Sequence, residues 1–453
     1  MAAYLLEKQT KLACRLTLFE AGYRLGGKLL TETFATGRCQ FEAGAAELYD
    51  YSNLGPDPLR ELVAELGLTT SPMEGGSAII RDRLVRQSAD LGRIWGPATA
   101  AGYAQFTVLA RAHISPANYY ESDWRQDNAD PLARQKFHEL LERVTDPAAR
   151  DYIRIMTHSD LACEPHQTNA VYGLQNFLMD EADYLRLYSI DGGNERLTRE
   201  LARRLTATVR LQHPVVRVEP IAGRAYRVTS RHLGNLEAAE FDYVIVALPN
   251  NWIPAIEWGG DSLAAAMARH HRCYDQPGHY LRVTARFAQP FWRTTIGGSF
   301  FMSDAFGGCC LYDEGTRFAS AGDAAVLSWL IAGEPALNLA NLDDDAVIEQ
   351  VLASLPASLQ AGRALFREAR VHRWLNTVNA LPGGFPAAEP DARHRPDPAA
   401  HPGVLVVGDY LFDSTLNGVL DSADTAVELL VQQCIPASAP ANLAGAAAPV
   451  RNP

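Results

Sequence analysis

The stretch LTLFEAGYRLGGK brings an acid, two cations and a glycine pair close together near the start of the chain. Glu20 ends a short apolar run, and Arg24, Gly26, Gly27 and Lys28 follow it. Paired glycines let backbone amides approach a phosphate group, and the two cations supply positive charge for it. The residue types therefore indicate an anion-binding turn, and the alternative is a surface turn whose cations are solvated.

The acid Glu20 has a second candidate role, which depends on the elements around it. AAYLLEKQTK predicts the end of a helix, and residues 15–20, RLTLFE, predict a strand covered on both faces. In a βαβ unit that binds a dinucleotide, an acid about 20 residues after a glycine-rich turn holds a ribose hydroxyl, and Glu20 fits that acid. The glycine-rich turn is absent because the sequence starts inside the helix. We expect a missing first strand, and the alternative is that the chain binds something else.

The rest of the chain predicts the helices and strands that would position these residues. Residues 58–68, PLRELVAELGL, have apolar positions at helical spacing, and the stretch from about Arg81 to Arg186 reads as a helix-rich inserted block. SIDGGNERLTRELARRL predicts a glycine turn that opens an amphipathic helix. VVRVEP, AYRVTS and YVIVALP, separated by turn residues, predict a β-meander. LRVTARFAQPFW and AAVLSWLIAG predict two more strands, and DDDAVIEQVLASL predicts another helix.

The C-terminal part predicts a second buried strand and a long helix. GVLVVGDY, residues 403–410, is the strand, and Ser414 or Thr415 is expected to cap the helix that follows. Asp409 lies at the end of the strand, where an acid that caps a helix start is the ordinary interpretation. Residues 434–453, rich in alanine and proline, are expected to be disordered.

These segments together resemble the flavin-containing amine oxidase superfamily, which includes monoamine oxidases, amino-acid oxidases and phytoene desaturase-like enzymes. Its pattern of a strand followed by E-A-x-x-R-x-G-G-R and later by G-A is similar to FEAGYRLGGK followed by FEAGAAEL. Its middle piece resembles HPVVRVEP, where Val215 matches the valine whose backbone contacts the adenine. The resemblance covers most of the chain in four collinear segments. It departs from the pattern in two places, because GxGxxG is missing and Lys28 replaces the second arginine.

The closing segment of that superfamily resembles VLVVGDYLFDSTLNGVLDSADTAVELL. The match implies that Asp409 lies near the ribityl and pyrophosphate groups of FAD, and that Leu416 and Asn417 begin a helix beside the flavin. A helix N-terminus presents free amides and a partial positive charge, which favour the electron-rich N1 and O2 edge of a reduced flavin.

Two residues are candidates for contact with the reacting part of the substrate. In the amine oxidases a lysine upstream of a P-F-W motif holds a water near flavin N5, and the matching position is Arg282. An arginine cannot exchange a proton at neutral pH, so Arg282 is expected to clamp a substrate carboxylate or to be structural. Trp374 matches a tryptophan that lines the flavin site. The alternative is that Trp374 is a structural residue of the hydrophobic core.

The resemblance implies an α/β fold of two domains. One is a Rossmann-like, NAD(P)-binding-like FAD domain of the GR2 type, expected in residues 1–75, 190–260 and 395–433. The other is a substrate domain that combines a mixed sheet with helices, expected in residues 76–189 and 261–394.

The implied activity is that of an FAD-dependent oxidoreductase. A hydride passes from the C–N bond of an amine or amino acid to flavin N5, and O2 or another electron acceptor reoxidises the flavin. One alternative is a desaturase or isomerase that acts on a polyene or another apolar substrate. The other is a flavin-free, non-catalytic remnant.

The composition limits the classes of partner. Of the 453 residues 47% are hydrophobic and 21% are charged, and the formal net charge of -12 offers no electrostatic case for nucleic acid or an anionic membrane surface. No apolar run approaches the length of a membrane span, and the N-terminus has no signal-peptide pattern. The seven cysteines are expected to be reduced and mostly buried thiols. We therefore expect a cytoplasmic enzyme that acts on a small molecule and has no metal site. A homodimer is a candidate assembly.

Overall fold

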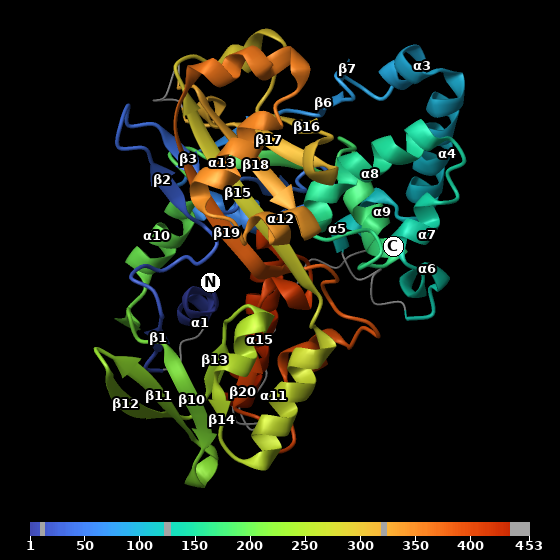
Figure 1. Cartoon of the computed structure of the whole chain (residues 1–453). Helices are drawn as coiled ribbons and strands as arrows, with labels where there is room; N and C mark the ends of the chain where they lie inside the picture. The colour runs from blue at the N-terminus through green and yellow to red at the C-terminus, as the bar shows by residue number, and fades with distance from the viewer. Residues whose placement is uncertain (10–13, 122–127, 319–323, 435–453) are drawn as a thin grey trace.

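The computed structural model describes residues 1–9, 14–121, 128–318 and 324–434 (Figure 1). Helices and strands alternate along the chain, and the strands form both parallel and antiparallel pairs. This is the mixed α/β fold that the sequence predicts. The tail predicted to be disordered, residues 434–453, lies outside the described residues from residue 435 onward.

A group of parallel strands and helices is built from both ends of the chain. Two parallel strand pairs form it, β1 with β9 and β13 with β20. The strands are β1 (Thr17–Phe19), β9 (Thr208–Arg210), β13 (Val244–Val246) and β20 (Val404–Val406). The helices are α1 (Ala2–Gln9), α2 (Pro58–Glu65), α10 (Glu195–Arg204) and α15 (Leu416–Cys434). Residues of all four helices share one hydrophobic cluster with strand β20, so the N-terminal and C-terminal segments pack together.

The meander contains a different third strand from the predicted one. Strands β10 (Val215–Pro220), β11 (Tyr226–His232) and β12 (Asn235–Phe241) form it, and β14 (Glu257–Trp258) pairs with β10. The predicted third strand, YVIVALP, is instead β13, which lies parallel to β20. The prediction was wrong because β12 has the polar, largely exposed sequence NLEAAEF, which carries no strong strand signal.

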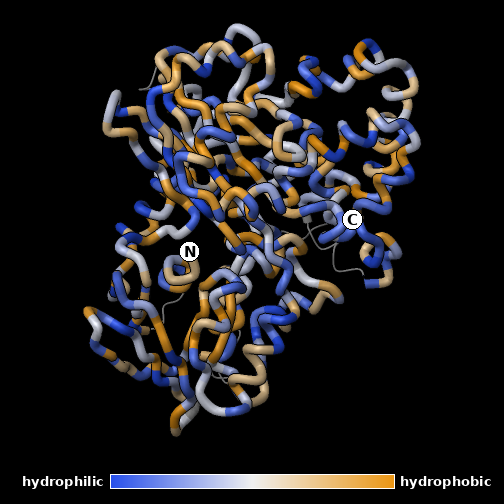
Figure 2. Tube along the Cα trace, in the orientation of Figure 1, coloured by the Kyte–Doolittle hydropathy of each residue, from blue (hydrophilic) through white to orange (hydrophobic). Residues whose placement is uncertain are grey.

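A seven-stranded sheet forms the largest layer of the molecule. Its order is β19-β15-β18-β17-β16-β6-β7. The bounds are β6 (Ser77–Ile80), β7 (Arg83–Val85), β15 (Pro277–Phe287), β16 (Phe300–Ser303), β17 (Cys309–Asp313), β18 (Val326–Ala332) and β19 (Phe366–Asn379). Helices α12 (Gly333–Leu339) and α13 (Asp344–Ala353) contribute to the same core as its central strands. Figure 2 shows hydrophobic residues along the strands of this sheet.

The helix-rich block lies to one side of this sheet (Figure 1). It contains α3 (Asp90–Trp95), α4 (Pro97–His113), α5 (Pro116–Glu121), α6 (Pro131–Arg134), α7 (Phe137–Leu141), α8 (Pro147–Leu161) and α9 (Ala170–Leu178). Two of these helices, α6 and α8, begin with a proline after an aspartate cap; Asp146, for example, accepts the backbone N–H of Ala149. The block therefore follows the start signals in the sequence.

Short elements connect these layers. They are β2 (Thr31–Thr33), β3 (Gln40–Glu42), β4 (Leu48–Asp50), β5 (Thr70–Met73), β8 (Arg186–Ile190), α11 (Asp261–Cys273) and α14 (Pro390–His394). Helix α11 packs in one cluster with β10, β13 and β20, although it falls on the substrate side of the predicted boundary. The domain boundaries stay a prediction.

The cysteines are less buried than the sequence predicts. Three are buried, Cys163, Cys309 and Cys310, whereas the other four are exposed or half-buried. The expectation of mostly buried thiols was therefore wrong, because Cys273 and Cys434 end helices α11 and α15, and Cys14 and Cys39 lie outside helices and strands. All seven are free thiols. Among the described residues, no helix is both long enough and apolar enough to cross a membrane.

Candidate active site

The glycine turn has the backbone conformation that glycine favours. Gly26 and Gly27 have φ values of 117° and 52°, in the left-handed region. A Cβ atom on Gly26 would lie 2.7 Å from the Thr198 hydroxyl of α10. Arg24 folds back onto the turn, where its guanidinium donates to the carbonyl of Leu29 at 2.8 Å and to that of Gly27 at 2.6 Å. Arg24 therefore holds the shape of the turn.

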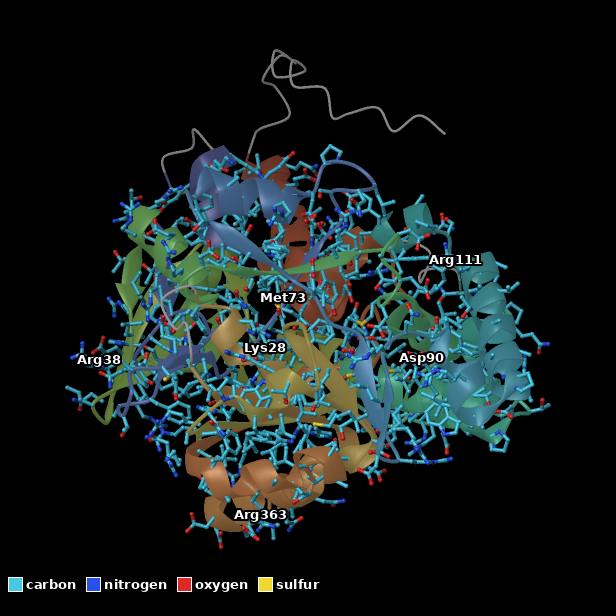
Figure 3. The ribbon with its side chains drawn as sticks, turned by 90° about the horizontal axis from the view of Figure 1, so that it is seen from above. Lys28, Arg38, Met73, Asp90, Arg111 and Arg363 are labelled. Atoms are coloured by element: carbon cyan, nitrogen blue, oxygen red, sulfur yellow. The ribbon has the colours of Figure 1, made fainter. Side chains whose placement is uncertain are left out.

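Lys28 connects the glycine turn to the C-terminal segment. Its ammonium group donates to the carbonyl of Thr377 at 2.8 Å and forms an ion pair with the carboxylate of Asp409. Figure 3 shows Lys28 in the middle of the molecule, whereas Arg38, Arg111 and Arg363 lie near its edge. The structure thus brings together two predicted cofactor residues that are far apart in the sequence.

We expect Asp409→Asn to lower the free energy of unfolding by about 1 kcal/mol, because it removes the negative charge that pairs with the half-buried Lys28 ammonium group. Urea unfolding of the full chain measures the change. The matched control is Glu65→Gln, which weakens the more exposed Lys8–Glu65 pair and should cost less. Equal losses in the two variants would show that the Lys28–Asp409 pair contributes no more to the free energy of unfolding than the exposed Lys8–Glu65 pair.

Glu20 and Val215 lie near each other at the end of β1. The backbone N–H of Glu20 donates to Arg210 O at 2.9 Å, and its carbonyl accepts the N–H of His213 at 2.9 Å. Val215, two residues farther on, begins β10. The Glu20 carboxylate accepts the backbone N–H of Gly22 at 2.6 Å, and its second oxygen accepts no hydrogen bond from the part of the chain that the structure describes.

The segment FEAGAAEL packs directly against the glycine turn. A Cβ atom on Gly44 would lie 1.8 Å from the carbonyl oxygen of Lys28. That same oxygen accepts the N–H of Ala45 at 2.9 Å. Only glycine permits this approach between the two backbones. Gly44 is not among the predicted site residues, although the G-A pair of the family pattern marks this position.

Three consecutive carbonyls, those of residues 43–45, accept hydrogen bonds from three different elements. Trp374 Nε1 donates to the first at 2.7 Å, Arg282 Nη1 to the second at 3.0 Å and Asn194 Nδ2 to the third at 3.0 Å. The two predicted catalytic residues therefore meet at one short segment. Asn194 was missed because an asparagine at a helix start is typical of an ordinary cap.

Arg282 is buried in a network of charges and aromatic rings. Its Nη2 donates to the buried carboxylate of Glu314 at 3.1 Å, and its guanidinium lies 4.7 Å from the centre of the Tyr312 ring. Arg317 lies 4.8 Å from the same ring centre and 3.4 Å from the Glu314 carboxylate. These contacts favour a positioning role for Arg282, and its predicted contact with the substrate stays a prediction.

Glu42 is a buried acid beside this network. It accepts the backbone N–H of Asn194 at 2.8 Å and the hydroxyl of Thr31 at 2.9 Å. Burial, followed by the negative charge of Glu314, raises the pKa of Glu42 to about 7 against the opposing effect of these hydrogen bonds. The Glu42 carboxyl group therefore titrates close to neutral pH.

Stability is expected to fall as the pH rises through the pKa of Glu42. In the folded state the Glu42 carboxyl group keeps its proton up to about pH 7, whereas in the unfolded chain it loses the proton near pH 4.3. The stability that the protonated group contributes is complete below about pH 4.3 and is lost as the pH rises to about 7. Glu42→Gln should remove a loss on the order of 2 kcal/mol between about pH 5 and about pH 8. Urea midpoints measure it, with the exposed Glu139→Gln as control. A pH profile unchanged by Glu42→Gln would contradict the assignment.

The closing segment presents the start of helix α15. The Thr415 hydroxyl accepts the backbone N–H of Gly418 at 3.1 Å and so confirms the predicted cap. Leu416 is the first residue of the helix. Asn417 Oδ1 is buried without a hydrogen-bond partner among the described residues, although its Nδ2 approaches Asp57 at 3.5 Å. An unpaired acceptor beside a helix N-terminus fits a ligand that carries hydrogen-bond donors.

The described residues fit a flavin nucleotide in their donor and acceptor chemistry. An acid ends β1, the glycine turn leaves open space within 4 Å of the Cβ position of Gly27, and Asn417 offers an unpaired acceptor. FAD, when bound, supplies a two-electron acceptor that no side chain provides. Among the described residues, no group of three or more histidine, cysteine or acidic side chains could hold a metal ion.

Comparisons with known proteins agree with this arrangement. Putrescine oxidase bound to putrescine has a TM-score of 0.73 and 19% identity, over 95% of this chain and 96% of that chain. Cyclohexylamine oxidase from Brevibacterium oxydans IH-35A has a TM-score of 0.74 and 19% identity, over 96% of each chain. At this identity the likeness shows the fold alone. A search of the curated proteins finds no match.

The family comparison covers nearly the whole chain. The model of the flavin containing amine oxidoreductases matches residues 1–431, which include the glycine turn, the FEAGAAEL segment and helix α15. The chain is thus an FAD-dependent oxidoreductase by family and by fold. It belongs to the flavin containing amine oxidoreductase family.

Proposed function

We propose that this enzyme oxidises the C–N bond of an amine or amino acid. The observation that carries the proposal is the convergence of the glycine turn, the FEAGAAEL segment and the closing segment through Lys28, Gly44 and Asp409. Family membership supports flavin chemistry, and the amine class is our inference from the amine oxidases that share this fold, putrescine oxidase and cyclohexylamine oxidase. We also propose that Glu20, Arg24, Gly26, Gly27, Lys28, Val215, Asp409, Leu416 and Asn417 form the FAD site.

The reaction removes a hydride from the carbon that bears the nitrogen of a neutral amine and leaves an iminium ion, which water hydrolyses to a carbonyl compound and an ammonium ion. The two electrons pass on to O2 or to another acceptor. Arg282 holds the carbonyl of Gly44 in place and takes no proton. Trp374 fixes the neighbouring carbonyl through its indole N–H and presents an aromatic wall.

Anaerobic mixing with candidate substrates tests the proposal. We expect primary amines or amino acids to bleach the flavin absorbance of the purified enzyme, and readmitted O2 or an artificial acceptor to restore it. Bleaching by a polyene but by no amine would establish the desaturase alternative instead. A preparation that holds no flavin would favour the non-catalytic alternative. A cytoplasmic location and a homodimer stay predictions.

A further inference from the structure

The exposed residues of helix α4, Pro97–His113, carry no charge. After Pro97 they are four alanines with Gln105, Val108 and Leu109. Val108 is 69% exposed and Leu109 is 37% exposed. The outward face of a helix on a protein surface ordinarily carries charged and polar side chains. An uncharged face with two large apolar side chains indicates a surface that another molecule covers.

Contacts on the opposite side of α4 determine which of its residues point outward. The centroid of the Phe106 ring lies 4.9 Å from that of the Phe177 ring in α9. A Cβ atom on Gly102 would lie 3.1 Å from the Cβ atom of Ala149 in α8. Figure 1 shows α4 at the outer edge of the helix-rich block. Packing therefore sets the rotation of α4 about its axis, and Val108 faces away from the block.

The two basic side chains of α4 turn back into the protein. Arg111 Nη1 lies 3.2 Å from Glu181 Oε2, and the same guanidinium pairs with Asp183. His113 Nε2 lies 2.8 Å from Asp130 Oδ2. These pairs leave the outward face uncharged along the whole helix, whose 17 residues span about 25 Å.

The exposed residues repeat at the spacing of a helix pair. One stripe contains Ala98, Ala101, Gln105, Val108 and Ala112, which follow one another at alternating intervals of three and four residues. Side chains at this spacing lie in one row, and such a row packs against an equivalent row on a second helix. The outward face of α4 therefore has the pattern of a surface that packs against another helix.

The two ends of the stripe differ in size in a way that matches an antiparallel copy of the same helix. The first half carries small side chains, such as Ala101, whereas the second half carries the larger Val108 and Leu109. In an antiparallel pair centred on Gln105, Ala101 of each copy lies opposite Val108 and Leu109 of the other. Large side chains then meet small ones, which permits close packing along the seam.

The charges beside the two ends of α4 also match in this arrangement. At its start Arg93, whose side chain is 72% exposed, and Arg86 share one acid, Asp90. At its end Arg111 faces two acids, and the side chain of Asp183 is 53% exposed. An antiparallel copy brings the basic start of each helix to the acidic end of the other, whereas a parallel copy brings like charges together.

We propose that this face binds the same face of a second copy of the chain, with the two α4 helices antiparallel around Gln105. The inference goes beyond the proposed function and does not depend on the substrate. One pair of helices buries less than the roughly 800 Å² per partner of a standard interface, so we expect a dissociation constant of micromolar order.

Sedimentation velocity of the full-length enzyme tests the inference, over about 0.1 to about 100 µM chain. We expect a monomer–dimer equilibrium, and Val108→Asp should weaken it at least about tenfold because each dimer buries two such carboxylates. The matched control is Leu233→Asp, which charges a leucine that is 86% exposed elsewhere, and it should leave the equilibrium unchanged. Arg93→Glu should weaken the dimer by at least about threefold, whereas Arg367→Glu, an exposed arginine of β19, should not.

A cysteine on the symmetry axis tests the antiparallel arrangement separately. Gln105→Cys should form a cross-linked dimer on mild oxidation, because the two copies of residue 105 lie opposite each other. Ala98→Cys should not, because its two copies are about 21 Å apart along the helix axis and a disulfide joins Cα atoms about 6 Å apart. The wild type under the same oxidation corrects for the native exposed cysteines.

Three outcomes would overturn the proposal. They are a chain that stays monomeric at every concentration, a dimer that Val108→Asp and Leu233→Asp affect equally, and cross-linking of Ala98→Cys as readily as Gln105→Cys. An unchanged melting temperature shows that Val108→Asp is folded, which its exposed position leads us to expect.

Discussion

Replacing Arg282 by methionine is expected to lower the free energy of unfolding by about 3 kcal/mol. The change leaves the Glu314 carboxylate buried without its nearest cation and removes the donor to the carbonyl of Gly44. Arg317 still lies 3.4 Å from Glu314, which keeps the cost at the lower end for a broken buried ion pair. Urea unfolding followed by tryptophan fluorescence measures the loss.

A second arginine on strand β15 provides the control for Arg282. Arg286 pairs with Glu368 at 2.8 Å, but both side chains of that pair are partly exposed. Arg286→Met should therefore cost less than about 1 kcal/mol. The double variant Arg282→Met with Glu314→Gln should recover part of the loss, because it removes the uncompensated charge. Equal costs for the two arginines would contradict the role of Arg282 as a buried positioning residue.

Replacing Gly44 by alanine is expected to weaken FAD binding by at least about tenfold. The new Cβ atom would meet the Lys28 carbonyl oxygen at 1.8 Å, and because this neighbour is backbone, the FEAGAAEL segment must move away from the glycine turn. The three carbonyls held by Trp374, Arg282 and Asn194 would move with it. Flavin retained per protein after dialysis, read from absorbance, measures the effect.

Gly55→Ala is the matched control, because a Cβ atom there meets nothing within 4 Å. We expect it to retain flavin like the wild type. If Gly44→Ala retained as much flavin as Gly55→Ala, the FEAGAAEL segment would not be part of the cofactor site.

The elements that carry the site could be predicted because local signals mark them. RLTLFE and GVLVVGDY are short apolar runs, and they form β1 and β20. The cap at Thr415 and the apolar periodicity that follows predict α15. The glycine pair predicted a turn, and the structure contains a turn there in which both glycines have positive φ. Each of these features depends on residues close together in the sequence.

The charge network could not be predicted in the same way, because its partners are far apart in the sequence. Nothing near Arg282 indicates that Glu314 pairs with it, and nothing near Lys28 indicates its ion pair with Asp409. Strand β12 was missed for a different reason, since its polar sequence reflects an exposed strand. This segment is a strand because it pairs with β11, and a single sequence does not show such pairing.

Hydrogen–deuterium exchange of the enzyme with and without FAD tests the central claim most directly. If the three segments form one site, FAD should slow amide exchange in all of them, which are residues 20–28, 41–47 and 409–418. The exchange rates in helix α13, Asp344–Ala353, should stay unchanged. Protection confined to one segment, spread over α13, or absent from all three would show that these segments do not bind one flavin nucleotide.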